Sequence, residues 1–199
     1  MCLELKGYFV NQKMRFDTVE GDDLLVFLHG QRTGGSAFRA KVLCEIFSRE
    51  SIYAHQYVEN WKKWYNVDDG DLDGFDVFVG HNDFYEKEIN RKTRFITIMR
   101  HPFYRFVSLY GYVQNRKKSP YRLEWELARG SMVDFFKNVM SSSVSGKNSG
   151  MRYVINPLCR RICGYPDFEA AKAIIEERYF AVGCMENLST FADFIAEFF

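Results

Sequence analysis

The stretch VFLHGQRTGGSAFRAKVL, residues 26–43, decides the fold that this chain predicts. It begins inside an apolar run over residues 24–29, which indicates a buried strand. Phe38, Val42 and Ile46 follow at the spacing of one helix face. The turn between the strand and the helix contains the small residues Gly30, Gly34, Gly35 and Ser36. A strand, a glycine-rich turn and a helix in this order predict an α/β fold with an anion site at the turn.

The glycine spacing resembles a phosphate-binding loop that lacks one part. From Gly30 the pattern G-x-x-x-x-G leads directly to Ser36, whereas a Walker A loop has a lysine before its serine. The nearest cation is Arg32, which lies inside the turn. The sequence therefore predicts a phosphate-binding turn whose cation comes from a different position.

Composition sets limits on the class of protein. A chain of 199 residues suits one domain, so we expect a single domain over residues 1–199 that begins with a hairpin extension over residues 1–23. The formal net charge of +1 creates no overall field that would attract nucleic acid, so any anion site must be local. The five cysteines show no C-x-x-C or metal-ligand spacing, and we expect neither a disulfide framework nor a metal.

No signal peptide and no long apolar run is visible in the sequence. We therefore expect a cytoplasmic protein with no transmembrane segment.

Four apolar runs predict strands at residues 24–29, 76–80, 94–99 and 179–183. Helical patterns are predicted between them at 36–49, 103–114, 131–140 and 167–178, with another short one starting near Ser189. Alternating strands and helices predict a central parallel sheet flanked by helices. Ligands of such sheets bind at the carboxyl ends of the strands. Residues 53–74 and 114–150 follow neither pattern.

A second candidate anion site follows the strand at 94–99, in the stretch RHPFYRFVSLYGYV. Arg100 stands at the end of the strand, and Ser108 lies two turns into the next helix. An arginine and a hydroxyl can hold one phosphate together. The predicted buried stripe of this helix consists of Phe103, Phe106, Val107, Tyr110 and Val113. With the glycine-rich turn, this site indicates a ligand with two anionic groups.

The two stretches together resemble the nucleotide-binding signatures of carbohydrate sulfotransferases, the branch that includes heparan sulfate O-sulfotransferases. FLHGQRTGGSAF is similar to the pattern H-x-P-K-T-G-G-T/S, and IMRHPFYRFVSLY to R-D-P-x-x-R-F-x-S-x-Y. Gly80 and His81 match a "GH" that follows a strand in that family, and Val182, Gly183 and Glu186 match a later "vG-x-x-E". The similarity runs from Leu24 to the C-terminus; the family usually continues further, so its closing portion would be absent here.

The resemblance implies a transferase whose donor is 3′-phosphoadenosine 5′-phosphosulfate, with no metal. Its acceptor would be a hydroxyl of a carbohydrate or glycolipid. Arg100 and Ser108 would hold the 3′-phosphate, and a segment near the adenine is matched weakly by Asn148 and Arg152. The 5′-phosphosulfate would lie on the helix N-terminus and on the backbone amides of Thr33, Gly34, Gly35 and Ser36.

Three departures from the family pattern and one candidate base concern the chemistry of the transfer. Arg32 stands where the family has a lysine that contacts the bridging oxygen, and Gln31 stands where it has proline. An arginine supplies the same charge through a planar fork. His101 replaces the family aspartate. His81 follows the strand at 76–80, and its ordinary pKa suits a general base for the acceptor hydroxyl.

Two other readings of the same residues stay open. A nucleotide kinase with a degenerate loop would need a Mg²⁺-binding acid and a lysine, and neither is clear in the sequence. The second alternative is a nucleotide- or glycan-binding relative of sulfotransferases that has no catalytic activity, and the presence of Arg32 in place of the family lysine supports it. For the acceptor, rings within residues 57–65 would either stack on sugars or pack a helix, and the cations at 116–118 would meet an acidic glycan or solvent.

Overall fold

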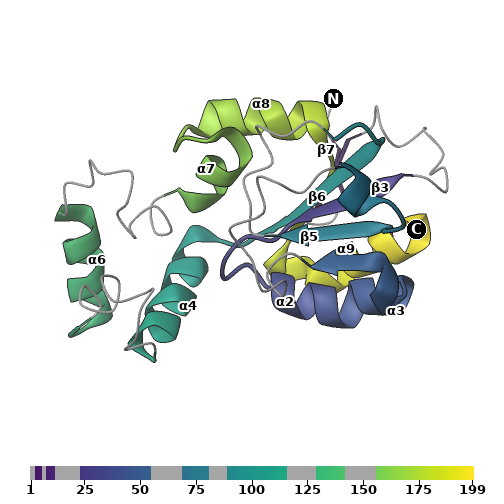
Figure 1. The fold of residues 1–199 in the computed structure, drawn as a ribbon. Coiled ribbons are helices and arrows are strands. Elements are labelled where there is room, and N and C mark those ends of the chain that lie inside the picture. The colour runs from purple at the N-terminus through teal and green to yellow at the C-terminus, as the bar shows by residue number, and fades with distance from the viewer. Residues whose placement is uncertain are drawn as a thin grey trace.

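A computed structural model describes residues 3–5, 8–11, 23–54, 69–80, 89–115, 129–141 and 156–199. In these residues a seven-stranded sheet has helices on both faces (Figure 1). The α/β class predicted from the sequence is confirmed.

The sheet is mixed rather than wholly parallel. Its strand order is β1 (Leu3–Leu5), β2 (Tyr8–Val10), β7 (Tyr179–Cys184), β6 (Thr93–Met99), β3 (Leu24–Leu28), β5 (Val77–Gly80) and β4 (Ile52–Ala54). The strands from β7 to β4 are parallel, whereas β2 is antiparallel to both β1 and β7. The antiparallel pair of β1 and β2 forms one edge of the sheet, within the range where the sequence predicts a hairpin extension; residues 1–2, 6–7 and 12–22 lie outside the described part.

Strand β3 lies inside the sheet, and all five of its residues are buried. Leu24, Val26 and Leu28 belong to the apolar cluster that includes residues of α7 (Pro157–Cys163) and α8 (Phe168–Arg178). Leu25 and Phe27 belong to the cluster on the other face, with the helix that follows β3 and with α9 (Leu188–Phe198). Burial of each of these large apolar side chains contributes roughly 1.5–3 kcal/mol, so both faces of this strand anchor the fold.

The helix after β3 ends earlier than the sequence predicts. It consists of α2 (Gly35–Phe38), a π-helical segment (Arg39–Leu43) and α3 (Cys44–Ile46). Phe47 has φ −112° and ψ 148°, an extended conformation that stops the helix. The Ser48 side chain then accepts a hydrogen bond of 3.2 Å from the Ser51 backbone N–H, and the chain enters β4. Three residues are too few to show the alternation of a strand, which is why β4 was not predicted.

The helices α4 (Pro102–Gln114), α6 (Met132–Ser141) and α8 lie within one residue of their predicted limits, and α9 begins next to Ser189. The predicted buried stripe of α4, however, is correct only in part, since Val113 is buried and Phe106 and Tyr110 pack partly buried against the cluster that α4 shares with α6. Phe103 is 56% exposed and Val107 is exposed as well, while Arg105, Leu109 and Val113 are buried. The reason is the partner of this helix: α4 packs on α6 through Leu109 and Val113, beyond the end of the strands in Figure 1.

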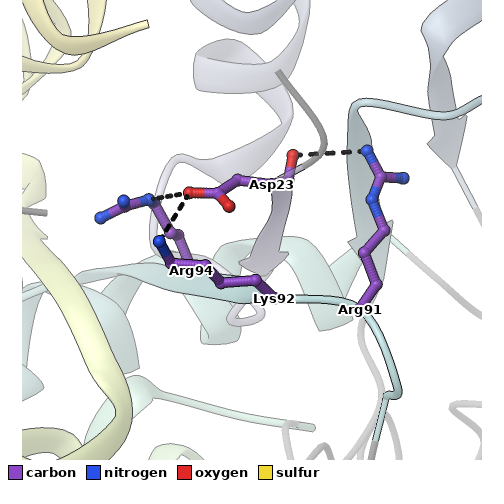
Figure 2. Close-up of polar contacts among 4 residues, drawn as sticks. All are labelled: Asp23, Arg91, Lys92 and Arg94. Carbon is purple, nitrogen blue, oxygen red and sulfur yellow. Dashed lines mark hydrogen bonds and ion pairs between the residues drawn. The ribbon is translucent and has the colours of Figure 1, made fainter. Parts of the chain in front are cut away.

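A buried ionic network closes the opposite end of the sheet, where β3 and β6 begin (Figure 2). The Nε atom of Arg94 donates to Oδ2 of Asp23 at 2.7 Å, and the two side chains are only 3% and 2% exposed. Lys92 is 3.9 Å from the same oxygen. Arg91 donates to the carbonyl groups of Phe75 and Asp23, at 2.6 and 3.5 Å. This network ties the strand beginnings together and lies far from the candidate site, which is at the strand ends.

Candidate functional site

The candidate site lies where neighbouring strands send the chain to opposite faces of the sheet. Strands β3 and β6 are parallel neighbours, with Leu28 paired to Thr97, so their carboxyl ends lie side by side. After β3 the chain forms the helix on the α9 face; after β6 it passes through α4 and α6 to α7 and α8 on the other face. Such a switch in direction leaves a crevice at the carboxyl ends of the strands, where ligands of open α/β sheets bind.

The turn over residues 29–34 is held by a backbone hydrogen bond to β5 and by one hydroxyl inside the turn. The backbone N–H of His29 donates to the carbonyl of Gly80 at 2.8 Å, and Oγ1 of the buried Thr33 donates to the carbonyl of Gly30 at 2.9 Å. Gly34 has φ 85°, and Arg32 also lies in the left-handed region with φ 64°. A non-glycine residue pays about 1–2 kcal/mol for this conformation, so contacts elsewhere must hold Arg32 in place.

Packing requires the glycines of this turn. A Cβ atom on Gly34 would collide with Met185, and one on Gly35 would collide with the ring of His29. A Cβ atom on Gly30 would approach Cδ2 of Leu158 to 2.7 Å. Close approach therefore explains the glycine spacing without any ligand, and the case for an anion site depends on the charged and hydroxyl side chains.

The structure brings Arg32 and Ser108 into direct contact. Nε and Nη2 of Arg32 donate to Oγ of Ser108 at 3.1 and 3.0 Å, and the guanidinium carbon lies 4.8 Å from the ring centroid of Tyr112. The sequence placed these two residues in separate subsites, one for each end of the ligand. In the folded chain the turn after β3 and the helix after β6 instead form one continuous polar surface.

Arg100 joins the same surface through the backbone of the turn. Its Nη1 atom donates to the carbonyl oxygen of Arg32 at 3.3 Å. Within the described residues, neither Arg32 nor Arg100 has a carboxylate at ion-pair distance. Two positive charges thus lie on this surface, one beside the Ser108 hydroxyl and one beside the backbone of the turn.

Glu186 supports the beginning of α4 beside these arginines. Its Oε1 accepts the backbone N–H of His101 at 3.1 Å, and its Oε2 accepts the thiol of Cys184 at 2.7 Å. Burial acts to raise the pKa of Glu186, but these hydrogen bonds, its own backbone N–H and the charge of Arg100 outweigh burial and lower it. Burial and the contact with Glu186 raise the pKa of the Cys184 thiol. Glu186 is therefore ionised at neutral pH and fixes the segment that carries Arg100.

Sequence reasoning assigned no role to two buried arginines near the site, Arg105 of α4 and Arg161 of α7. Burial, together with the smaller effect of the Arg161 charge, lowers the pKa of Arg105 to about 10. The signal was present, because Arg105 is the second arginine of the RHPFYR stretch and lies four residues before the buried Leu109. The assumption that only apolar residues form the buried stripe concealed it.

Several predicted site residues fall outside the described part of the chain. They include the candidate base His81, the candidate adenine contacts Asn148 and Arg152, the rings at 57–65 and the cations at 116–118. Their roles stay predictions. Of the remaining candidates, Ser36 is exposed in the first turn of α2, next to the buried Gly35.

No protein-family model matches this chain, and a search of curated proteins finds no significant match. The resemblance to sulfotransferases therefore stays an expectation from the two sequence signatures. Among the described residues, no group of three or more His, Cys, Asp or Glu side chains is arranged to hold a metal ion. Nor does any helix in the same ranges have the length and apolar character to cross a membrane.

Proposed function

We propose that this protein is an O-sulfotransferase that moves a sulfonate group from 3′-phosphoadenosine 5′-phosphosulfate to a hydroxyl of a carbohydrate or glycolipid. The observation that supports the proposal is the convergence of Arg32, Arg100 and Ser108 at the ends of two adjacent parallel strands. Guanidinium groups and a hydroxyl are donors that suit phosphate and sulfate oxygens.

The positions of these N–H and O–H groups suit 3′-phosphoadenosine 5′-phosphosulfate better than a nucleoside triphosphate. The nucleotide carries anions at both ends, a 3′-phosphate and a 5′-phosphosulfate. In the proposal Arg100 and Ser108 take the 3′-phosphate, and Arg32 with the backbone amides of residues 33–36 takes the 5′ end. Residues 29–36 contain no lysine, the residue that a P-loop places on the β- and γ-phosphates.

The contact between Arg32 and Ser108 has a consequence for binding. The Ser108 hydroxyl accepts from Arg32, which leaves its own hydrogen to donate to an oxygen of a 3′-phosphate, so this phosphate would lie beside the Arg32 guanidinium. The N–H groups on Nη1 of Arg32, which do not contact this hydroxyl, would be available to add bonds to an anion. Hydrogen bonds to charged partners contribute about 1.5–3 kcal/mol, against about 1 kcal/mol for neutral ones.

In the proposed reaction the acceptor oxygen forms a bond to sulfur while the bond between sulfur and the bridging oxygen breaks. The electron pair of that bond stays on the departing 5′-phosphate, where Arg32 offsets the developing charge. His81 takes the proton of the acceptor hydroxyl. The products are a sulfate ester and 3′-phosphoadenosine 5′-phosphate, and all atoms and charges are accounted for.

Calorimetric titration with 3′-phosphoadenosine 5′-phosphate, in the presence of a metal chelator, tests the donor site. We expect saturable binding by the wild type, weakened by Ser108→Ala. The variant Arg49→Ala, which removes an exposed arginine before β4, is the control and should bind like the wild type. Binding of ATP with Mg²⁺ in preference to this nucleotide would contradict the proposal and favour the kinase.

A second measurement separates an enzyme from a binding relative. Transfer of radiolabelled sulfate from the donor to a panel of polysaccharide and glycolipid acceptors supports the enzyme. Binding of the donor with no transfer to any acceptor in the panel would favour the relative without catalysis.

A further inference from the structure

The Arg32 side chain contacts two consecutive turns of α4. Ser108 and Tyr112 are four residues apart, so they lie one above the other on the same helix face. Nε and Nη2 of Arg32 donate to the Ser108 hydroxyl, and its guanidinium carbon lies 4.8 Å from the ring centroid of Tyr112, a distance typical of a cation–π contact. The hydroxyl and the ring together determine where this cation lies.

The Tyr112 ring is itself held in place. Tyr112 is partly buried against the small apolar cluster that joins α4 to α6, formed by Leu109, Val113, Phe135 and Val139. The ring is therefore a fixed surface for an arginine that is otherwise exposed. Packing between α4 and α6 is in this way transmitted to a residue of the glycine-rich turn.

This arrangement leaves part of the guanidinium available. An arginine has five N–H groups, and the Ser108 hydroxyl is approached by only two of the nitrogen atoms, Nε and Nη2. The donors on Nη1 face no other described residue at hydrogen-bond distance. A cation that the ring holds before the ligand arrives loses less freedom when an anion binds, and such preorganisation raises affinity.

We propose that Tyr112 is a positioning residue for Arg32, and that their contact suits this site to an arginine where similar sulfotransferases have a lysine. The inference depends on the proposed function, because the anion that Arg32 meets is taken to be that of the sulfonate donor. A lysine ammonium is a compact point charge with no planar fork. It cannot present two nitrogen atoms to Ser108 while a third part of the same group lies over the ring one turn further on.

A double-mutant cycle on nucleotide affinity tests the inference, with 3′-phosphoadenosine 5′-phosphate as the probe. Tyr112→Phe keeps the ring and should bind within about twofold of the wild type. Tyr112→Leu removes the ring and should weaken binding about two- to fivefold, the range for an exposed cation–π contact. In an Arg32→Ala background Tyr112→Leu should have no further effect. Equal weakening in both backgrounds would overturn the inference and give Tyr112 a purely structural role.

Tyr110→Leu is the matched control. Tyr110 lies on the same helix and packs on the same cluster, but its hydroxyl donates to the carbonyl of Gly130 at 2.7 Å, and its contacts do not include Arg32. This variant should lower stability with no coupling to Arg32. If Tyr112→Leu does not fold, Tyr112→Met, of similar volume and without a ring, replaces it in the cycle.

A ligand-free cycle separates failure of this inference from failure of the proposed function. Urea unfolding of the wild type, Arg32→Ala, Tyr112→Leu and the double variant reports whether the two side chains are coupled. If the wild type binds no nucleotide, the sulfotransferase proposal fails, and the same affinity cycle with inorganic sulfate then decides the role of Tyr112. Absence of coupling in the unfolding cycle overturns the inference whatever the ligand.

Discussion

The Arg32 guanidinium donates to the Ser108 hydroxyl through Nε and Nη2, at 3.1 and 3.0 Å, although the two residues are 76 positions apart in the chain. One belongs to the turn after β3 and the other to the helix after β6, and the parallel pairing of these strands brings them together. Both residues are therefore central to the predictions on binding.

Arg100→Ala should weaken 3′-phosphoadenosine 5′-phosphate by about 1.5–3 kcal/mol, the contribution of a hydrogen bond to a charged group. Adenosine 5′-phosphosulfate lacks the 3′-phosphate and should be weakened much less. Any loss of affinity for adenosine 5′-phosphosulfate measures how much the hydrogen bond from Arg100 to the carbonyl of Arg32 supports the turn. Calorimetric titration of both ligands checks this, with Arg49→Ala as control, and equal losses would make Arg100 a structural residue.

His81→Ala should leave the affinity for 3′-phosphoadenosine 5′-phosphate nearly unchanged and lower turnover by roughly 10²–10⁴-fold, as expected for removal of a general base. The measurement is sulfate transfer at saturating donor, followed over a range of pH. His101→Ala is the matched control, because it removes an exposed ring and keeps the backbone N–H that donates to Glu186. Turnover lowered equally by both variants would remove His81 from the mechanism.

Asp23→Asn should destabilise the protein by about 3–5 kcal/mol, because it removes the carboxylate charge that faces the buried Arg94 guanidinium. Lys92→Met removes the other cation near the same carboxylate, but Lys92 is 46% exposed and 3.9 Å away, so about 0–1 kcal/mol is expected. Urea unfolding measures both values. Similar losses for the two variants would show that the contribution of the Asp23–Arg94 pair in Figure 2 to stability does not depend on its burial.

Glu186 should make stability depend on pH in the acid range. Although burial opposes the shift, hydrogen bonds from Cys184, Glu186 and His101 and the charge of Arg100 place the folded pKa of Glu186 below its ordinary value of 4.5. A lowered folded pKa means that the stabilisation is present above pH 4.5 and is lost as the pH falls through the folded value. Urea unfolding should therefore show a smaller loss in acid for Glu186→Gln than for the wild type. The exposed Glu177→Gln serves as control, and identical pH profiles for wild type and Glu186→Gln would disprove the effect.

Local patterns in the sequence were sufficient for the elements that bear the site. The apolar run at Leu24–Leu28 is buried on both faces, so its pattern is continuous and easy to recognise. Pro102 correctly marks the beginning of α4. Features that depend on long-range contacts were missed. Leu109 of α4 is buried against α6, Arg105 is buried near the charge of Arg161 in α7, and β4 exists because β5 provides its hydrogen-bond partners.

By itself the sequence determined the class of the fold, four of the parallel strands with the helices that follow three of them, and the presence of a glycine turn and an arginine at two strand ends. These features depend on residues near one another in the chain, whose spacing records which side chains are buried and which backbone angles are accessible. Only the tertiary structure decided that β6 lies beside β3, that an antiparallel hairpin forms an edge, and that Arg32 rests on Ser108 and Tyr112. The order of strands in the sheet and the partners of side chains depend on contacts between residues that are distant in the chain. The sequence around Arg32 or around Ser108 does not show that the two residues meet.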